Sequence, residues 1–203
     1  MYLDLINQKQ VLLFRFGTNL DSGSNCMLSP SQLDSDAAKS FCSSMILSDN
    51  AKKFAIAREV NRTIAQPFLI QGGISFSFTL LTYNISRIVN QRLGLFKRPP
   101  LIRGIMYVSL LPSMILSYFV IKDAYSCFID KQLDKKAAQI NSEYAAGGVE
   151  YYDKMMQRNR ALRELNGESG RAMYTGKGDI VHGIVRVKTA SIQDRRDICA
   201  NLV

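Results

Sequence analysis

Two long stretches in the middle of the chain carry no formally charged side chain. Residues 63–86 form an uncharged run of 24, and residues 104–121 form one of 18, of which 13 are aliphatic, aromatic or Met. A helix rises about 1.5 Å per residue, so such runs nearly or fully cross a hydrocarbon core of about 30 Å. The pattern predicts a transmembrane helical hairpin over residues 63–121, with spans at about 64–86 and 104–121.

The connector between the two predicted spans, residues 87–103, is basic. It contains no acidic residue and five cations: Arg87, Arg92, Lys97, Arg98 and Arg103. Short loops with this charge stay on the side of the membrane where the protein is made or retained. These residues are therefore predicted to determine the topology, with both termini on the opposite side. The alternative is a soluble protein with two buried core helices, but such helices normally keep a polar stripe and the second stretch has none.

The segment before the hairpin, residues 1–62, is predicted to be rich in loops and to end in a helix. Potential N-cap residues at 48–50 precede strong helix formers over 51–62, with Arg58 pointing away from the apolar face of Phe54. We expect this amphipathic helix to lie at the membrane surface, and Pro67 to kink the chain where the first span begins.

The segment after the hairpin, residues 122–203, is predicted to be a helical domain. Apolar residues recur at three- and four-residue steps from Leu133 to Leu165, which is typical of a long amphipathic helix. Gly147 and Gly148 either break this helix into an antiparallel pair or allow close approach of another helix. Residues 180–187 alternate as in a short strand or hairpin, and 191–202 suit a helical turn. The fold class is thus an all-α membrane protein with a small C-terminal strand or hairpin.

The charge distribution narrows the set of partners. The net charge is +9, and more than half of it lies in the loop 87–103. A concentrated charge of this kind fits membrane topology and anionic lipid headgroups rather than nucleic acid.

No arrangement typical of a catalytic, cofactor or metal site is present in the sequence. The four cysteines, at positions 26, 42, 127 and 199, form no close pair, so free thiols are expected; a Cys26–Cys42 disulfide is the alternative. His182 is the single histidine. The run 175–178 (Thr-Gly-Lys-Gly) departs twice from a phosphate-binding loop and is interpreted as a turn. We therefore expect no enzyme activity, no cofactor, no metal and no small-molecule substrate.

Several blocks outside the predicted spans closely resemble the transmembrane protein 177 family. They are residues 51–60, the run 144–152 (Tyr-Ala-Ala-Gly-Gly-Val-Glu-Tyr-Tyr), 161–163, 174–175 and 195–197, in that order around the hairpin. The resemblance covers about residues 49–197, and the Gly-Gly-Val-Glu-Tyr-Tyr block is its most specific part. Family members usually carry a longer N-terminal part with another hydrophobic segment.

The resemblance implies a multi-pass protein of the mitochondrial inner membrane without catalytic activity. It implies a role in cytochrome c oxidase biogenesis, with newly made subunit 2 and its assembly chaperone as partners. Both termini would then face the intermembrane space.

The surface predicted to bind a partner is centred on the two glycines. Close backbone approach would offset their helix-breaking cost, and nearby tyrosines are enriched in binding centres. The candidate residues are Tyr144, Gly147, Gly148, Glu150, Tyr151 and Tyr152. A carrier or pore of oligomerised hairpins is the alternative function, but ionisable residues usually mark a transport path and neither span has any. A copper-handling protein is a third hypothesis.

Overall fold

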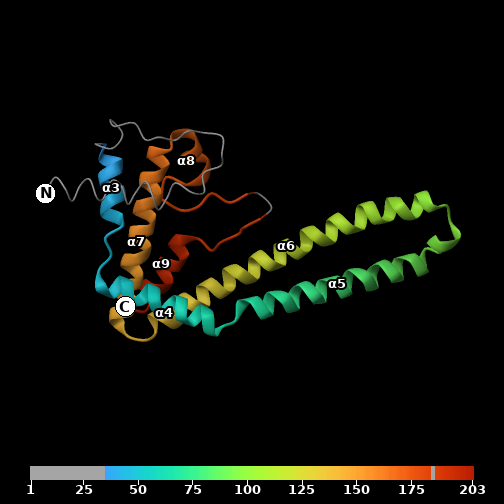
Figure 1. The fold of residues 1–203 in the computed structure, drawn as a ribbon, viewed down its shortest axis with the longest axis horizontal. Coiled ribbons are helices and arrows are strands. Elements are labelled where there is room, and N and C mark those ends of the chain that lie inside the picture. Colours follow the sequence, from blue (N-terminus) through green and yellow to red (C-terminus); the bar gives the residue numbers. More distant parts are fainter. Residues whose placement is uncertain (1–34, 184–185) are drawn as a thin grey trace. The chain divides into compact units, whose positions relative to one another are not determined.

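The computed structural model describes residues 35–183 and 186–203, and its regular elements are helices. Residues Asp36–Val203 form one compact unit. Among the described residues, two helices precede a helical hairpin and three follow it (Figure 1). The elements are α3 (Asp36–Ser44), α4 (Asp49–Ile64), α5 (Pro67–Arg92), the short 3-10 helix η1 (Leu95–Lys97), α6 (Pro100–Ala138), α7 (Ser142–Leu165), α8 (Gly167–Met173) and α9 (Ile192–Ala200).

The prediction of a strand or hairpin over residues 180–187 was wrong for the described positions 180–183 and 186–187. Their place is taken by irregular chain, and β pairing in the described part is limited to one isolated bridge between Tyr174 and Ile180. An alternating run forms a strand only where another strand offers its edge. Asp179 instead accepts hydrogen bonds from the Ser191 hydroxyl and the Ile192 backbone, which fixes the start of α9. The predicted helical turn over 191–202 is confirmed.

The start of α4 and its break from α5 follow the sequence signals. The Ser48 hydroxyl accepts a hydrogen bond from the Ala51 backbone N–H at 3.2 Å, as expected of an N-cap. After α4 ends, Gln66 adopts a left-handed conformation (φ 44°), and Pro67 opens α5 at a position where its missing N–H costs nothing. The two helices meet at 45°. The predicted break at Pro67 is confirmed.

Helices α5 and α6 lie side by side as an antiparallel hairpin (Figure 1). The predicted loop 87–103 is shorter than expected, because α5 continues to Arg92 and α6 begins at Pro100. Arginine is a good helix former, so basic character alone does not end a helix. The chain turns at Gly94, which is left-handed (φ 58°), and at Pro99, which cannot continue a helix.

Helix α6 is long and apolar enough to cross a membrane, with 39 residues and a mean hydropathy of 1.8 over its most apolar part. Helix α5 passes the same test only together with α4, across the bend between them. Length and composition therefore identify one clear span and a second, bent candidate. At about 1.5 Å per residue, α6 measures roughly 58 Å, so its C-terminal part extends far beyond a bilayer core.

The stretch from Leu133 to Leu165, predicted as one long helix, is divided between the end of α6 and α7. Helix α6 continues to Ala138, and Asn141 caps α7 by accepting from the Glu143 backbone N–H at 2.8 Å. Gly147 and Gly148 lie inside α7 and do not break it. Of the two alternatives, close approach is confirmed and the turn is wrong.

The core of the helical domain is built where α4, α6, α7 and α9 meet. Its fully buried side chains include Phe54, Ala137, Tyr152 and Cys199. The backbone of Asn50 runs so close to α7 that a Cβ on Gly147 would lie 2.4 Å from the Asn50 carbonyl oxygen. The backbone approach permitted by the glycine pair is thus made by α4 of the same chain.

Candidate functional site

Three aspartates on one side of α6 form a row just beyond the apolar part of the helix. Asp123, Asp130 and Asp134 are seven and four residues apart, a spacing that places them on one helix face. All three are buried, and Asp134 has no exposed surface. Each is paired with at least one arginine from outside α6, so this row joins the hairpin to the rest of the fold. We call it the aspartate row.

Asp134 is the centre of the aspartate row. Its carboxylate accepts from Arg58 Nε of α4 at 2.8 Å, from the Tyr152 hydroxyl of α7 at 2.6 Å, and from Arg195 Nε of α9 at 2.6 Å. One buried carboxylate therefore joins four helices. The prediction that Arg58 points away from the packed face was wrong, since the pairing buries its guanidinium.

The other two aspartates extend the row toward the apolar part of α6. Asp130 pairs with Arg62 and with Arg58. Asp123 accepts two hydrogen bonds from Arg186, at 2.8 and 3.1 Å, and the same guanidinium lies 4.4 Å from the centre of the Phe119 ring. Arg186 thereby holds the C-terminal segment against α6 near the end of its apolar part.

The electrostatics of the row fit a structural role. Burial and the adjacent Asp134 charge raise the pKa of Tyr152, so its hydroxyl stays a donor. Burial alone would lower the pKa of Arg195, but its hydrogen bond and the charge of Asp134 raise it. The hydrogen bond from Arg186 lowers the pKa of Asp123. All these groups keep one protonation state near neutral pH, which suits permanent ion pairs rather than proton transfer.

The six residues predicted to bind a partner divide into enclosed and accessible ones. Gly147, Gly148 and Tyr152 are covered by the chain's own helices, with Gly148 against Phe54 and Cys199. Glu150 accepts hydrogen bonds from the backbone and hydroxyl of Ser48, which lowers its pKa. Tyr144 and Tyr151 are half-buried. Binding of a partner here stays a prediction, and the accessible tyrosines are where it would occur.

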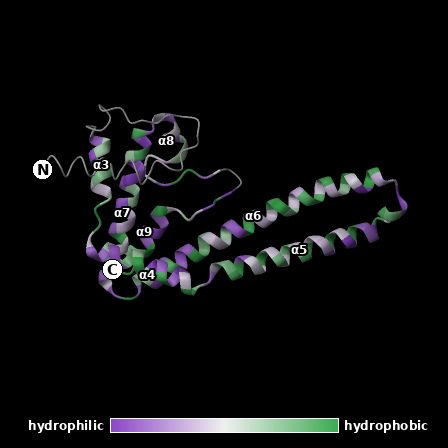
Figure 2. Ribbon diagram, in the orientation of Figure 1, coloured by the Kyte–Doolittle hydropathy of each residue, from purple (hydrophilic) through white to green (hydrophobic). Residues whose placement is uncertain are grey.

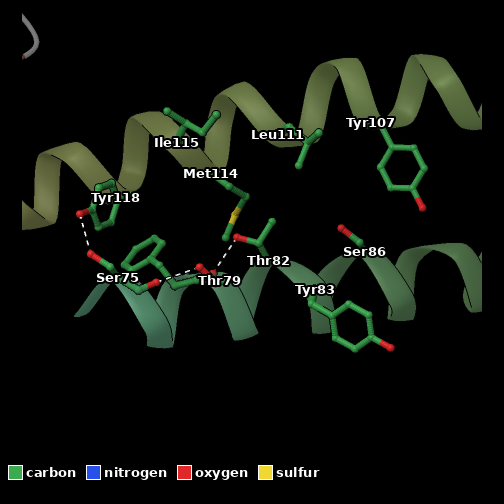
Figure 3. A pocket seen from close by; sticks show the side chains of 11 residues that line it. Ser75, Thr79, Thr82, Tyr83, Ser86, Tyr107, Leu111, Met114, Ile115 and Tyr118 are labelled. Carbon is green, nitrogen blue, oxygen red and sulfur yellow. Dashed lines mark hydrogen bonds between the residues drawn. The ribbon is translucent and has the colours of Figure 1, made fainter. Parts of the chain in front are cut away.

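A groove of about 650 Å³ lies between α5 and α6 (Figure 3). Hydroxyl side chains of α5 face apolar side chains of α6 across it. At one end the Ser75 and Tyr118 hydroxyls are 2.8 Å apart, and beyond the other end Asn90 donates to the Tyr107 hydroxyl at 2.7 Å. These two hydrogen bonds join α5 and α6 on either side of the groove, where the side chains of the two helices leave space between them.

The described thiols and the predicted turn agree with the sequence analysis. Cys42, Cys127 and Cys199 carry free thiols; Cys26 lies outside the described residues. The run 175–178 forms a turn, in which the Gly178 N–H donates to the Thr175 carbonyl at 3.0 Å. Across residues 35–183 and 186–203 there is no group of three His, Cys, Asp or Glu side chains that could hold a metal ion.

The structure defines a helical protein in which an apolar hairpin extends from a small helical domain fixed by buried ion pairs. The sequence profile described as Transmembrane protein 177 matches residues 27–198. The chain belongs to the transmembrane protein 177 family.

Relatives of that name confirm the assignment. The chain is 34% identical to transmembrane protein 177 of Xenopus laevis, over 82% of this chain and 54% of that protein. It is 30% identical to the Danio rerio protein (84% and 55%) and 30% identical to the Homo sapiens protein (76% and 50%). The chain thus spans about half the length of these curated relatives. No solved structure matches it.

Proposed function

We propose that the hairpin of α5 and α6 crosses the membrane twice. The packing of the flanking segments carries this proposal. Arg58 of α4, before the hairpin, and Arg195 of α9, after it, both donate to Asp134, which lies in α6 beyond its apolar part. Segments that share a core lie on one side of a membrane, so an even number of spans must separate them. A single span by α6 alone would place them on opposite sides.

The hydrogen bonding of α5 supports its insertion despite its polar side chains. Its hydroxyl and amide groups bond to carbonyl oxygens one turn earlier: Ser75 to Gln71, Thr79 to Ser75, Thr82 to Phe78 and Asn84 to Leu80, at 2.8–3.0 Å. A polar side chain bonded in this way leaves fewer unsatisfied groups facing lipid. The bend at Gln66 then marks the point where the chain enters the membrane.

The protein acts, on this proposal, in cytochrome c oxidase biogenesis in the mitochondrial inner membrane, without catalysis. The resemblance of the Gly-Gly-Val-Glu-Tyr-Tyr block to its family suggests newly made subunit 2 and its assembly chaperone as partners. A helical domain fixed by ion pairs to the end of a membrane helix supports this role, because it would present a rigid surface to a membrane-bound client. Both termini face the intermembrane space, opposite the basic loop.

The test is a crosslinking pull-down of the tagged full chain from detergent-solubilised mitochondria after pulse-labelling of mitochondrial translation. We expect labelled subunit 2 to be enriched over its level with a tagged, unrelated inner-membrane protein. Equal recovery with both baits would contradict the proposed role. The rival function, a carrier or pore of oligomerised hairpins, would instead be indicated by solute flux into vesicles that contain the purified chain.

A further inference from the structure

The turn that joins α5 and α6 is basic, and residues 87–103 contain five cations and no acidic residue. No acidic residue occurs between Glu59 and Asp123, and Figure 2 shows hydrophilic residues (purple) beside hydrophobic ones (green) at the end of the hairpin. In the part of the chain that the structure describes, arginines of the helical domain such as Arg58 and Arg186 pair with aspartates. None of the five cations of residues 87–103 is in such a pair there. These five cations are therefore available to bind an anion from outside the chain.

Apolar side chains lie among these cations. Leu93, Phe96 and Leu101 are 55%, 69% and 74% exposed, while Leu95 is buried and anchors the turn. The Arg103 guanidinium lies 5.8 Å from the centre of the Phe96 ring. Exposed leucine and phenylalanine next to unpaired cations are unfavourable in water but suited to a membrane interface, where apolar groups enter the acyl region and cations meet phosphates.

We infer that this turn, residues 92–103, binds the headgroups of anionic phospholipids in the leaflet that it enters. The ligand chemistry is a phosphate diester joined to acyl chains: Lys97, Arg98 and Arg103 contact the phosphate, and Phe96 and Leu101 contact the chains. Charge complementarity selects an anionic headgroup over a zwitterionic one. The inference rests on the proposed insertion of the hairpin and adds a lipid requirement to it.

The test uses the purified full chain in a neutral detergent, with native mass spectrometry to count bound lipids during titration. We expect phosphatidylglycerol to bind at least about tenfold more tightly than phosphatidylcholine. A basic residue near an anionic surface contributes roughly fivefold in affinity, so K97Q/R98Q should weaken phosphatidylglycerol binding about 25-fold. The matched control R171Q/K177Q removes two exposed cations of the helical domain and should change binding less than twofold.

Two further measurements distinguish binding of a phospholipid from binding of free phosphate. Phe96→Ser should weaken phosphatidylglycerol binding, and inorganic phosphate should not compete at millimolar concentration. Equal affinity for both lipids, equal loss in the two double variants, or competition by inorganic phosphate would each overturn the inference. The lipid titration requires no oxidase partner. If the pull-down fails but the chain still prefers phosphatidylglycerol, the role in oxidase biogenesis is contradicted and the lipid-binding inference stands.

Discussion

Arg58 and Asp134, 76 residues apart in the sequence and on opposite sides of the hairpin, are joined by a hydrogen bond of 2.8 Å. The pair is buried: Asp134 has no exposed surface. It connects the helix that enters the hairpin with the helix that leaves it. This contact holds the base of the hairpin in the core of the helical domain, so the chain enters and leaves the hairpin at the same place.

Removing the carboxylate of Asp134 should destabilise the domain strongly. Asp134→Ala leaves Arg195 buried without its counter-charge and leaves Arg58 with only Asp130 and Glu59 as acidic partners among the described residues. Loss of one member of a buried pair typically costs about 3–5 kcal/mol. Thermal or denaturant unfolding of the chain in detergent measures this. Asp194→Ala is the control, since its pair with Lys131 is exposed and should contribute below about 1 kcal/mol. Similar losses in both variants would show that burial of the pair is not what matters.

A methyl group at Gly147 should destabilise the packing of α4 on α7. Its Cβ would lie 2.4 Å from the Asn50 carbonyl, and overpacking of this kind costs about 1–3 kcal/mol. Gly176→Ala is the control, because no atom lies within 4 Å of a Cβ built there. A normal unfolding midpoint for Gly147→Ala would contradict the close approach.

A large side chain at Gly148 cannot be used to test whether a partner binds at the glycine pair. In Gly148→Leu the added side chain would meet Phe54 and Cys199 and would disturb folding itself.

Cys199 should be the least reactive of the three described cysteines. Burial, reinforced by the nearby charge of Asp134, raises its pKa to about 12, whereas the thiolate is the reactive form. At pH 8 a maleimide should modify Cys42 and Cys127 first, both half-buried, and Cys199 only after unfolding. Mass spectrometry of digested peptides measures the order. Rapid labelling of Cys199 in the folded protein would show that the contact between α7 and α9 opens readily.

The Asp123–Arg186 pair should make stability depend on pH in the acid range. The hydrogen bond from Arg186 lowers the folded-state pKa of Asp123 below its unfolded value of about 3.9. Its contribution is therefore complete at neutral pH and is lost as the pH falls from about 5 through the lowered value. The unfolding midpoints of wild type and Asp123→Asn should differ at pH 7 and converge toward pH 3. A constant difference would show that the pair contributes nothing through charge.

Local signals predicted most of the helical elements. The cap at Ser48, the break at Pro67 and the uncharged runs depend on neighbouring residues, so the sequence indicates them directly. The aspartate row was missed because periodicity reveals a helix face but not its partner across 76 residues. The seven- and four-residue spacing of Asp123, Asp130 and Asp134 was the available signal. The strand prediction failed for the same reason: alternation is local, but pairing is not.

The proposed topology requires two spans that leave both flanks of the hairpin on one side of the membrane. Single cysteines at exposed positions test this directly in a background without native cysteines: Lys39→Cys in α3, Lys97→Cys at the hairpin turn and Lys177→Cys in the helical domain. Mitoplasts that carry each variant are treated with a membrane-impermeant maleimide. We predict that the variants at 39 and 177 are labelled in intact mitoplasts, and that the variant at 97 is labelled only after detergent is added. Labelling of 39 and 177 from opposite sides, or of 97 together with both, would contradict the two-span hairpin.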